Sequence, residues 1–207
     1  MNKGLKCLLA LATLCGTAAA PADEFVYCTV CHGVQLMGNA VIQAPRLSGM
    51  ETWYVEQQLR NFSKGMRGTH EDDFPGNEMR PMAAVLSDQQ VGEAAGFANA
   101  TQSPAPAATV SGDVEKGKVH YSTCSVCHGV DGKGNEALGS PDLTIPNDWY
   151  LVRQLRNFKS GRRGSHPGDT YGMQMRASMQ LLADNEAIID VVSYINTLQT
   201  DDESGGQ

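Results

Sequence analysis

CTVCHGV at residues 28–34 and CSVCHGV at residues 124–130 share one pattern and lie 96 positions apart. Each stretch places two cysteines three positions apart, with a histidine directly after the second. The likeness extends beyond these motifs, because 25 of the 53 residues from 28 to 80 are identical to the residue 96 positions later, without a gap. Chance would give only a few identities. The chain therefore consists of two copies of one small domain.

The repeat also pairs residues with both chemical and structural uses. QLRNF at 58–62 returns at 154–158, and past Leu86 the register shifts by one, so that Phe97 corresponds to Tyr194. Further pairs are Gly38-Asn39 with Gly134-Asn135, Pro45 with Pro141, Trp53-Tyr54 with Trp149-Tyr150, His70 with His166, and Met79 with Met175. These pairs are the first candidates for a function that both halves share.

The first 20 residues have the features of a cleaved signal peptide. Two early lysines precede an apolar run at 8–14, which is too short to span a bilayer, and small residues at 18–20 suit cleavage. A lipoprotein signal at Cys15 is the weaker interpretation, because the large Leu14 stands where a small residue is usual. We expect the rest of the chain to divide into an N-terminal domain (21–101), a Pro-, Ala- and Ser-rich linker (102–112), a C-terminal domain (113–200) and a flexible tail (201–207).

The charge of the exported chain limits the classes of molecule that it can bind. Without Lys3 and Lys6 it holds 14 basic residues (16 − 2) against 23 acidic ones, a formal net charge of −9. Nucleic acid is therefore excluded as a partner, and docking on a basic protein surface should weaken with salt. No later segment could span a membrane, so we expect a soluble monomer, with peripheral membrane association left open.

Both halves are expected to be all-α. Asp113 is a suitable N-cap for a helix to about Tyr121, residues 150–158 show helical periodicity, and a last helix is expected from Asn185 to Leu198. No run alternates with the period of two that a half-buried strand shows. Gly- and Pro-rich loops are expected to fill the rest.

The spacing Cys-x-x-Cys-His is that of covalent heme attachment. Two thiols three residues apart on a helical turn can form thioethers with the vinyl groups of one porphyrin, and the adjacent histidine then points at the iron. Local disulfides or a thioredoxin-like motif would need no such histidine. A zinc site with four thiolates would not explain why each half has its own histidine and methionine. The sequence thus predicts two covalent heme c groups, held by Cys28, Cys31 and His32 and by Cys124, Cys127 and His128.

Heme iron needs a sixth ligand, or it keeps an open position for chemistry. Of the methionines in the exported chain, only Met79 and Met175 are related by the 96-residue offset, and both lie just before the last helix of their half. A thioether there gives His/Met ligation, which raises the reduction potential. The alternatives are that these methionines fill the core, or that the ligand is Met82, Met173, Met179, His70 or His166.

The axial histidines need a partner that orients the ring, and the carbonyl groups of Pro45 and Pro141 are candidates. Other repeated side chains could meet heme propionates: Trp53, Trp149, Tyr54, Tyr150, Arg60 and Arg156. The competing interpretation is that the aromatic rings pack the core and the arginines form a solvated helix face.

With these residues in place, the chain resembles the cytochrome c4 family of diheme class I cytochromes c over nearly all of residues 22–200. The two CxxCHG motifs, QLRNF with its Gly-rich loop, and the segments EMRPMAAVLSD and MQMRASMQLLAD carry the likeness. The resemblance implies two tandem cytochrome c domains, with Met79 and Met175 as ligands and Pro45 and Pro141 as carbonyl acceptors. It also implies a periplasmic electron carrier, not an enzyme, whose redox partners include a terminal oxidase or a quinol-cytochrome c reductase.

Two other functions stay open. The chain could be the electron-transfer subunit of a multi-subunit dehydrogenase or oxidase, or a diheme peroxidase, although the repeated methionine argues against an open iron site. One departure from the family concerns the opening helix, which packs a glycine and an aromatic residue on the last helix. The second half has Gly117 and Tyr121, whereas the first has Phe25 but Pro21 for the glycine. The first opening helix should therefore be short, and its heme more exposed.

Overall fold

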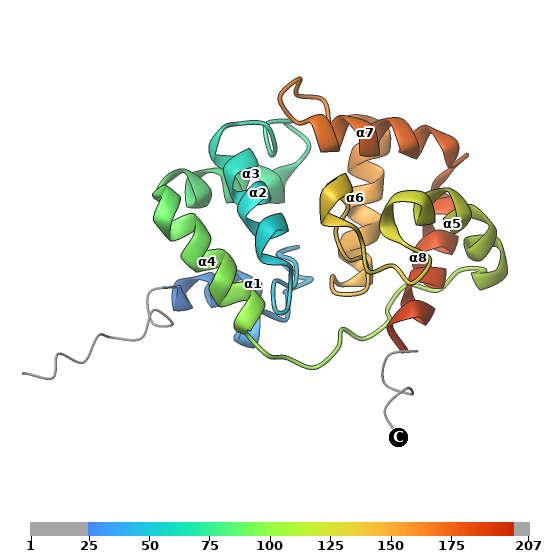
Figure 1. Ribbon diagram of the computed structural model, residues 1–207, viewed down its shortest axis with the longest axis horizontal. Helices are drawn as coiled ribbons and strands as arrows, with labels where there is room; N and C mark the ends of the chain where they lie inside the picture. The colour runs from blue at the N-terminus through green and yellow to red at the C-terminus, as the bar shows by residue number, and fades with distance from the viewer. Residues whose placement is uncertain (1–24, 201–207) are drawn as a thin grey trace, which may run out of the picture.

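The computed structural model describes residues 25–200, which form two helical halves lying side by side (Figure 1). Within this range no strand forms, and sheet-like pairing is limited to two isolated bridges, Asn39 with Ala44 and Asn135 with Ser140. The expected all-α class is confirmed. Across the described range, no helix combines the length and hydrophobicity that a membrane crossing needs. The predicted signal peptide and tail lie outside the described residues.

Within residues 25–200, each half contains four α-helices. The first half has α1 (Thr29–His32), α2 (Thr52–Ser63), α3 (Phe74–Ala84) and α4 (Asp88–Ala100), and the second has α5 (Val114–His128), α6 (Asp148–Ser160), α7 (Thr170–Ser178) and α8 (Asn185–Thr200). Short 3-10 turns are η2 (Val26–Cys28), η3 (Val34–Leu36), η4 (Glu136–Leu138) and η5 (Met179–Leu181). The order of helices thus repeats along the chain, as the duplication predicts.

In the second half, α5 and α8 make the closest helix contact. A Cβ added to Gly117 would lie 2.0 Å from the carbonyl oxygen of Asp190, so only glycine allows this approach. The Asp113 side chain caps α5 by accepting from the Lys116 N–H at 3.0 Å. The prediction that this helix ends near Tyr121 is wrong. Its residues up to the second motif are all compatible with a helix, and it stops only where Gly129 takes a positive φ.

The first half opens differently. Phe25 is buried and lies 6.3 Å from Phe97 of α4 between ring centroids, so it takes the place that Tyr121 has beside Tyr194. Within the described residues, which begin at Phe25, only the short η2 and α1 accompany it, in agreement with the predicted short opening helix. Pro21 lies outside the described residues.

The repeated methionines lie on helices, whereas loops were expected there. Asp73 precedes α3 and Pro75 falls in its first turn, where proline is tolerated. Gly68 has a φ of +73°, and a Cβ added to it would lie 2.2 Å from the Gly76 carbonyl oxygen. This contact fixes the first turn of α3 against the preceding loop and so positions Met79, one turn further along. The equivalent contact in the second half positions Met175 on α7.

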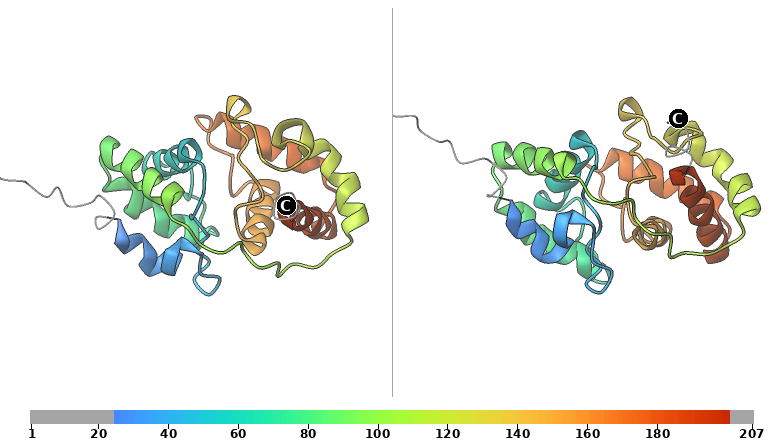
Figure 2. Two further views of the ribbon diagram at one scale, coloured as in Figure 1. Left: turned by 60° about the horizontal axis from the view of Figure 1, so that its bottom comes forward. Right: turned by 90° about the horizontal axis from the view of Figure 1, so that it is seen from below.

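The segment between α4 and α5 is bonded to both halves. The buried guanidinium of Arg46 donates to the carbonyl oxygens of Ser103 at 3.1 Å and Pro104 at 2.5 Å. Further along, the backbone N–H groups of Thr109 and Val110 donate to Asp148 at 2.5 and 2.7 Å. Figure 2 shows this segment running along one side of both halves. It therefore acts as a strap rather than a free tether.

The interface between the halves uses repeated residues with their roles exchanged. Asn61 of the first half donates to Asp169 of the second at 3.4 Å, and Asn157 donates to Asp73 at 3.3 Å. All four side chains are buried. The carboxylates also lie beside the first turns of α3 and α7, so the same residues join the halves and support the methionine helices.

Candidate heme-binding sites

Each half contains a cavity, of about 360 Å³ in the first and about 160 Å³ in the second. The residues that the repeat singled out line the cavity of their own half: Cys28, Cys31, His32, Pro45 and Met79 in the first, and Cys124, Cys127, His128, Pro141 and Met175 in the second. Leucine, valine and phenylalanine side chains supply much of the remaining lining. Each cavity thus brings the predicted attachment residues to one partly open, mainly apolar space.

Both motif histidines are buried and held by a backbone carbonyl. Nδ1 of His32 donates to the Pro45 oxygen at 2.7 Å, and Nδ1 of His128 donates to the Pro141 oxygen at 2.9 Å. Because a carbonyl can only accept, Nδ1 carries the proton and Nε2 keeps its lone pair for a metal. Burial lowers the pKa of each imidazole, and the carbonyl bond opposes this shift only in part. Both rings are therefore neutral, as a ligand requires.

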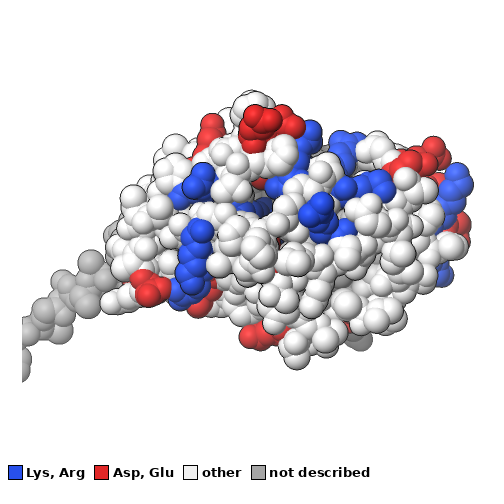
Figure 3. Space-filling model, turned by 90° about the horizontal axis from the view of Figure 1, so that it is seen from above, with Lys and Arg blue, Asp and Glu red and all other residues white. Residues whose placement is uncertain are grey.

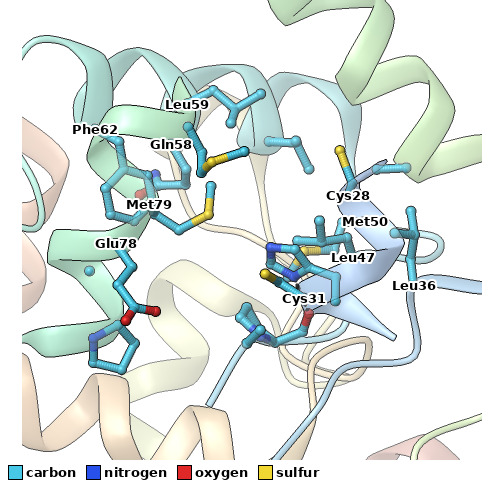
Figure 4. Close-up of a pocket in the computed structure, with 18 of the residues that line it drawn as sticks. Cys28, Cys31, Leu36, Leu47, Met50, Gln58, Leu59, Phe62, Glu78 and Met79 are labelled. Carbon is cyan, nitrogen blue, oxygen red and sulfur yellow. Dashed lines mark hydrogen bonds between the residues drawn. The ribbon is translucent and has the colours of Figure 1, made fainter. Parts of the chain in front are cut away.

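In the first cavity, the repeated methionine and the heme-attachment motif lie on different sides. Figure 4 shows Met79 reaching in from α3, while Cys28 and Cys31 lie across the cavity. Met82 also lines the first cavity, and Met179 lines the second beside Met175, whereas Met173 lines neither. His70 and His166 line neither cavity, and their Nδ1 atoms accept from the backbone N–H groups of Asp72 and Gly168. The geometry thus favours sulfur over a second imidazole.

The four cysteines of the described residues are not joined to one another. The first cysteine of each motif is half-buried, and the second is exposed. Burial raises the pKa of the Cys28 and Cys124 thiols. The arrangement gives no support to the alternative of local disulfides.

The structure does not support the propionate contacts predicted for Trp53, Trp149, Arg60 and Arg156, since none of them lines either cavity. Arg60 pairs instead with Asp88 and Glu56, and Arg156 donates to Asn185 at 2.6 Å. The predicted set included the neighbouring tyrosines, and Tyr54 and Tyr150 do line both cavities. The two arginines lie on the side of α2 and α6 that faces α4 and the start of α8.

Three other arginines reach the cavities: Arg67 and Arg153 line the first, and Arg163 lines the second. Their Nε atoms are buried and have no hydrogen-bond partner among the described residues. Guanidinium groups that line an apolar cavity suit the carboxylates of a heme, which otherwise would be buried without a counterion. The residues present therefore fit heme. The repeated Arg-Gly at 67–68 and 163–164 was a sequence signal that could have identified two of them.

Comparison with known proteins agrees with this geometry. The cytochrome c family profile matches residues 114–199. Cytochrome c4 of Azotobacter vinelandii is 31% identical over 96% of this chain and 100% of its own length. The thiosulfate dehydrogenase electron acceptor of Stutzerimonas stutzeri is 31% identical over 72% of this chain and 71% of its own.

Among solved structures, reduced cytochrome c4 from Pseudomonas stutzeri superposes with a TM-score of 0.66 and 26% identity, over 84% of this chain and 95% of that one. The duplicated cavities and the paired attachment motifs match a family whose members have two heme-binding domains and transfer electrons. The chain thus belongs to the cytochrome c4 family and binds two covalent heme c groups.

Proposed function

We propose that this protein carries single electrons between respiratory proteins of the periplasm, with both irons ligated by histidine and methionine. Heme c, when bound, supplies an iron that alternates between ferric and ferrous by one electron. Cys28, Cys31, His32 and Met79 would hold it in the first half, and Cys124, Cys127, His128 and Met175 in the second. We also propose that the N-terminal domain ends at residue 101 and that the C-terminal domain begins at residue 113.

The observation that carries the proposal is the construction of each cavity. One side offers a neutral imidazole whose orientation is fixed by a carbonyl, as at His32 and Pro45. The methionine of the same half enters the cavity from another helix. If the histidine and the methionine of each half both ligated the iron, neither half would leave a position for substrate, and these side chains would need to move little on electron transfer. This supports electron transfer rather than peroxidase chemistry.

The surface charge gives a more detailed view of docking than the net charge. Although the chain is acidic overall, Lys and Arg side chains spread over the middle of the face in Figure 3, with acidic side chains mostly nearer its edges. Exposed or partly exposed basic residues of α2, α3, α6, α7 and their loops are Arg60, Lys64, Arg80, Arg156, Lys159, Arg162 and Arg176. The partner can therefore be acidic at this face, and salt would still weaken docking.

We propose a terminal oxidase as the electron acceptor. A second candidate role, electron acceptor of a dehydrogenase, rests on the likeness to the thiosulfate dehydrogenase electron acceptor. Stopped-flow mixing with each purified partner separates the two: reduction by thiosulfate dehydrogenase with thiosulfate supports the second role, and oxidation by an oxidase supports the first. Failure of both reactions would contradict the proposed partners.

The cofactor proposal is tested on the purified protein alone. Mass spectrometry of the denatured chain should show two covalently added heme masses and removal of residues 1–20. Visible spectra should show low-spin iron in both oxidation states. A high-spin ferric spectrum, or turnover of peroxide, would contradict His/Met ligation and favour the peroxidase alternative.

A further inference from the structure

One position of the repeat has different residues in the two halves and contributes to the lining of both cavities. Arg153 on α6 of the second half lines the first cavity, and its repeat counterpart, Gln57 on α2 of the first half, lines the second. The side chain at this helix position in each half therefore lines the cavity of the other half. Only the first cavity receives a positive charge in this way.

Arg153 is held firmly where it crosses. Its Nη1 donates to the carbonyl oxygen of Gln43 at 2.8 Å and to the Gln43 side-chain oxygen at 2.9 Å, two residues before Pro45. Its guanidinium lies 5.2 Å from the centre of the Tyr150 ring, which favours a cation. Its Nε is buried and has no partner among residues 25–200. The guanidinium group is therefore held in place at the wall of the first cavity.

The other charged side chains lining the cavities do not reproduce this difference. They are Arg67, Asp73 and Glu78 in the first cavity, and Asp142, Arg163 and Asp169 in the second. Arg67 with Asp73 and Arg163 with Asp169 are repeat pairs whose charges match. Glu78 remains in the first cavity, but it is exposed, so water screens its charge. Asp142 remains in the second and makes that cavity more negative.

We propose that Arg153 raises the reduction potential of the first heme across the domain interface, and that the second heme receives no such contribution. Reduction adds one electron to ferric iron and gives ferrous iron with the same ligands, so the site becomes more negative by one charge. A guanidinium stays protonated at all working pH values, and in a partly buried position its attraction to the added electron is weakly screened. The proposal rests on heme being bound in the first half, and it does not depend on any redox partner.

The test is an equilibrium redox titration of the purified holoprotein, with chemical reductant and mediators, followed by visible absorption. Arg153→Gln copies the residue at 57 and should lower one of the two potentials while leaving the other in place. We expect the reduction equilibrium of that site to shift about tenfold, which corresponds to about 59 mV for one electron. Gln57→Arg should raise the other potential. The two substitutions must therefore act on different steps of the titration.

Two controls separate charge from structure. Arg156→Gln removes the same charge from the same helix at an exposed position that lines neither cavity, and it should leave both potentials nearly unchanged. Arg153→Lys keeps the charge and should restore most of the potential. Equal shifts of both hemes in Arg153→Gln, a shift no larger than in Arg156→Gln, or no recovery in Arg153→Lys would overturn the proposal. A chain without two covalent hemes by mass would instead refute the underlying function.

Discussion

Arg67 of the first half donates a hydrogen bond to the Tyr150 hydroxyl of the second at 2.7 Å, and its repeat counterpart Arg163 donates to the Tyr54 hydroxyl of the first at 3.2 Å. Both arginine residues are only 7% exposed. A buried cation is stable only where its donors find acceptors, so these bonds constrain how the two halves meet. Tyr54, Tyr150 and Arg67 line the first cavity, and Tyr54, Tyr150 and Arg163 line the second. Docking of the halves is therefore coupled to the shape of both sites.

Replacing Arg67 should weaken this interface strongly. Arg67→Met leaves the Tyr150 hydroxyl without its donor and removes one of the two arginine donors of Gln58 and of Gln154, which keep their bonds from Arg163. We expect a loss of about 2–4 kcal/mol in the free energy of unfolding. Urea unfolding followed by circular dichroism measures it. Arg60→Met is the control, because its ion pair with Asp88 is exposed and should contribute less than about 1 kcal/mol. Equal losses in the two variants would show that the crossed bonds do not determine the stability of the interface.

Removing the sixth ligand from one half should change only that half. Met79→Ala should convert the first iron from low spin to high spin and abolish its share of the weak far-red absorption that accompanies sulfur on ferric iron. The lost thioether should also lower the potential of that iron. Met175→Ala should do the same in the second half. Both changes are read in the oxidised visible spectrum and by electron paramagnetic resonance.

The neighbouring methionines provide matched controls for these substitutions. Met82 lines the first cavity and Met179 the second, so each could compete for the iron. Met82→Ala should leave the spectrum intact, since Met82 is 45% exposed. Met179→Ala should leave the spectrum intact but destabilise the core by about 2–4 kcal/mol, because Met179 is 2% exposed. Loss of the far-red band in Met82→Ala with retention in Met79→Ala would reverse the assignment in the first half.

The duplication made the pairs of cavity residues predictable, because a fixed offset identifies what both halves retain. It could not show which half each residue serves. Arg60 and Arg156 were chosen from the repeated QLRNF helix, but the helix turns them away, and Arg67 and Arg163 in the following loop reach the cavities. Only the packing of the helices shows that these loop arginines, and not the helix arginines, line the cavities, although the repeated Arg-Gly at 67–68 and 163–164 marks them as candidates.

Helix boundaries show a second limit of the sequence. The proline in the first turn of α3 reads as a loop signal, yet that position has no need of an N–H donor. The Pro-, Ala- and Ser-rich composition predicts a linker, and the structure adds that Arg46 and Asp148 bond it to both halves. Neither side chain lies within the linker, so its composition gives no sign of these long-range bonds.

Gly117 should tolerate no side chain. A Cβ there would lie 2.0 Å from the Asp190 carbonyl oxygen, so Gly117→Ala must push α5 from α8 and should cost about 2–4 kcal/mol. Gly96→Ala on α4 is the control, because no atom lies within 4 Å of its added Cβ. Alanine should stabilise that helix by about 0.5–1 kcal/mol. Thermal unfolding distinguishes the variants, and a Gly117→Ala protein as stable as the parent would contradict the described helix contact.

Asp148 should make the strap sensitive to acid. The carboxylate is 1% exposed, and burial by itself would raise its pKa. Hydrogen bonds from Thr109, Val110 and Asn196 outweigh that effect and hold the pKa below its ordinary value. A depressed pKa in the folded state means that the carboxylate stabilises the protein above the unfolded pKa of about 3.9. This contribution is lost as the pH falls through the lower folded value.

The comparison of Asp148→Asn with the parent isolates this contribution. The asparagine amide has one acceptor oxygen, and its N–H₂ group faces other donors. We therefore expect Asp148→Asn to lower the free energy of unfolding by about 1–3 kcal/mol at pH 7. The difference between the two proteins should hold down to about pH 5 and shrink towards pH 3, as the carboxylate of the unfolded parent chain gains its proton while the folded one stays charged. Urea unfolding at the three pH values measures it, and taking the difference removes the acids common to both. A gap that stays constant to pH 3 would mean that Asp148 acts through its shape, not its charge.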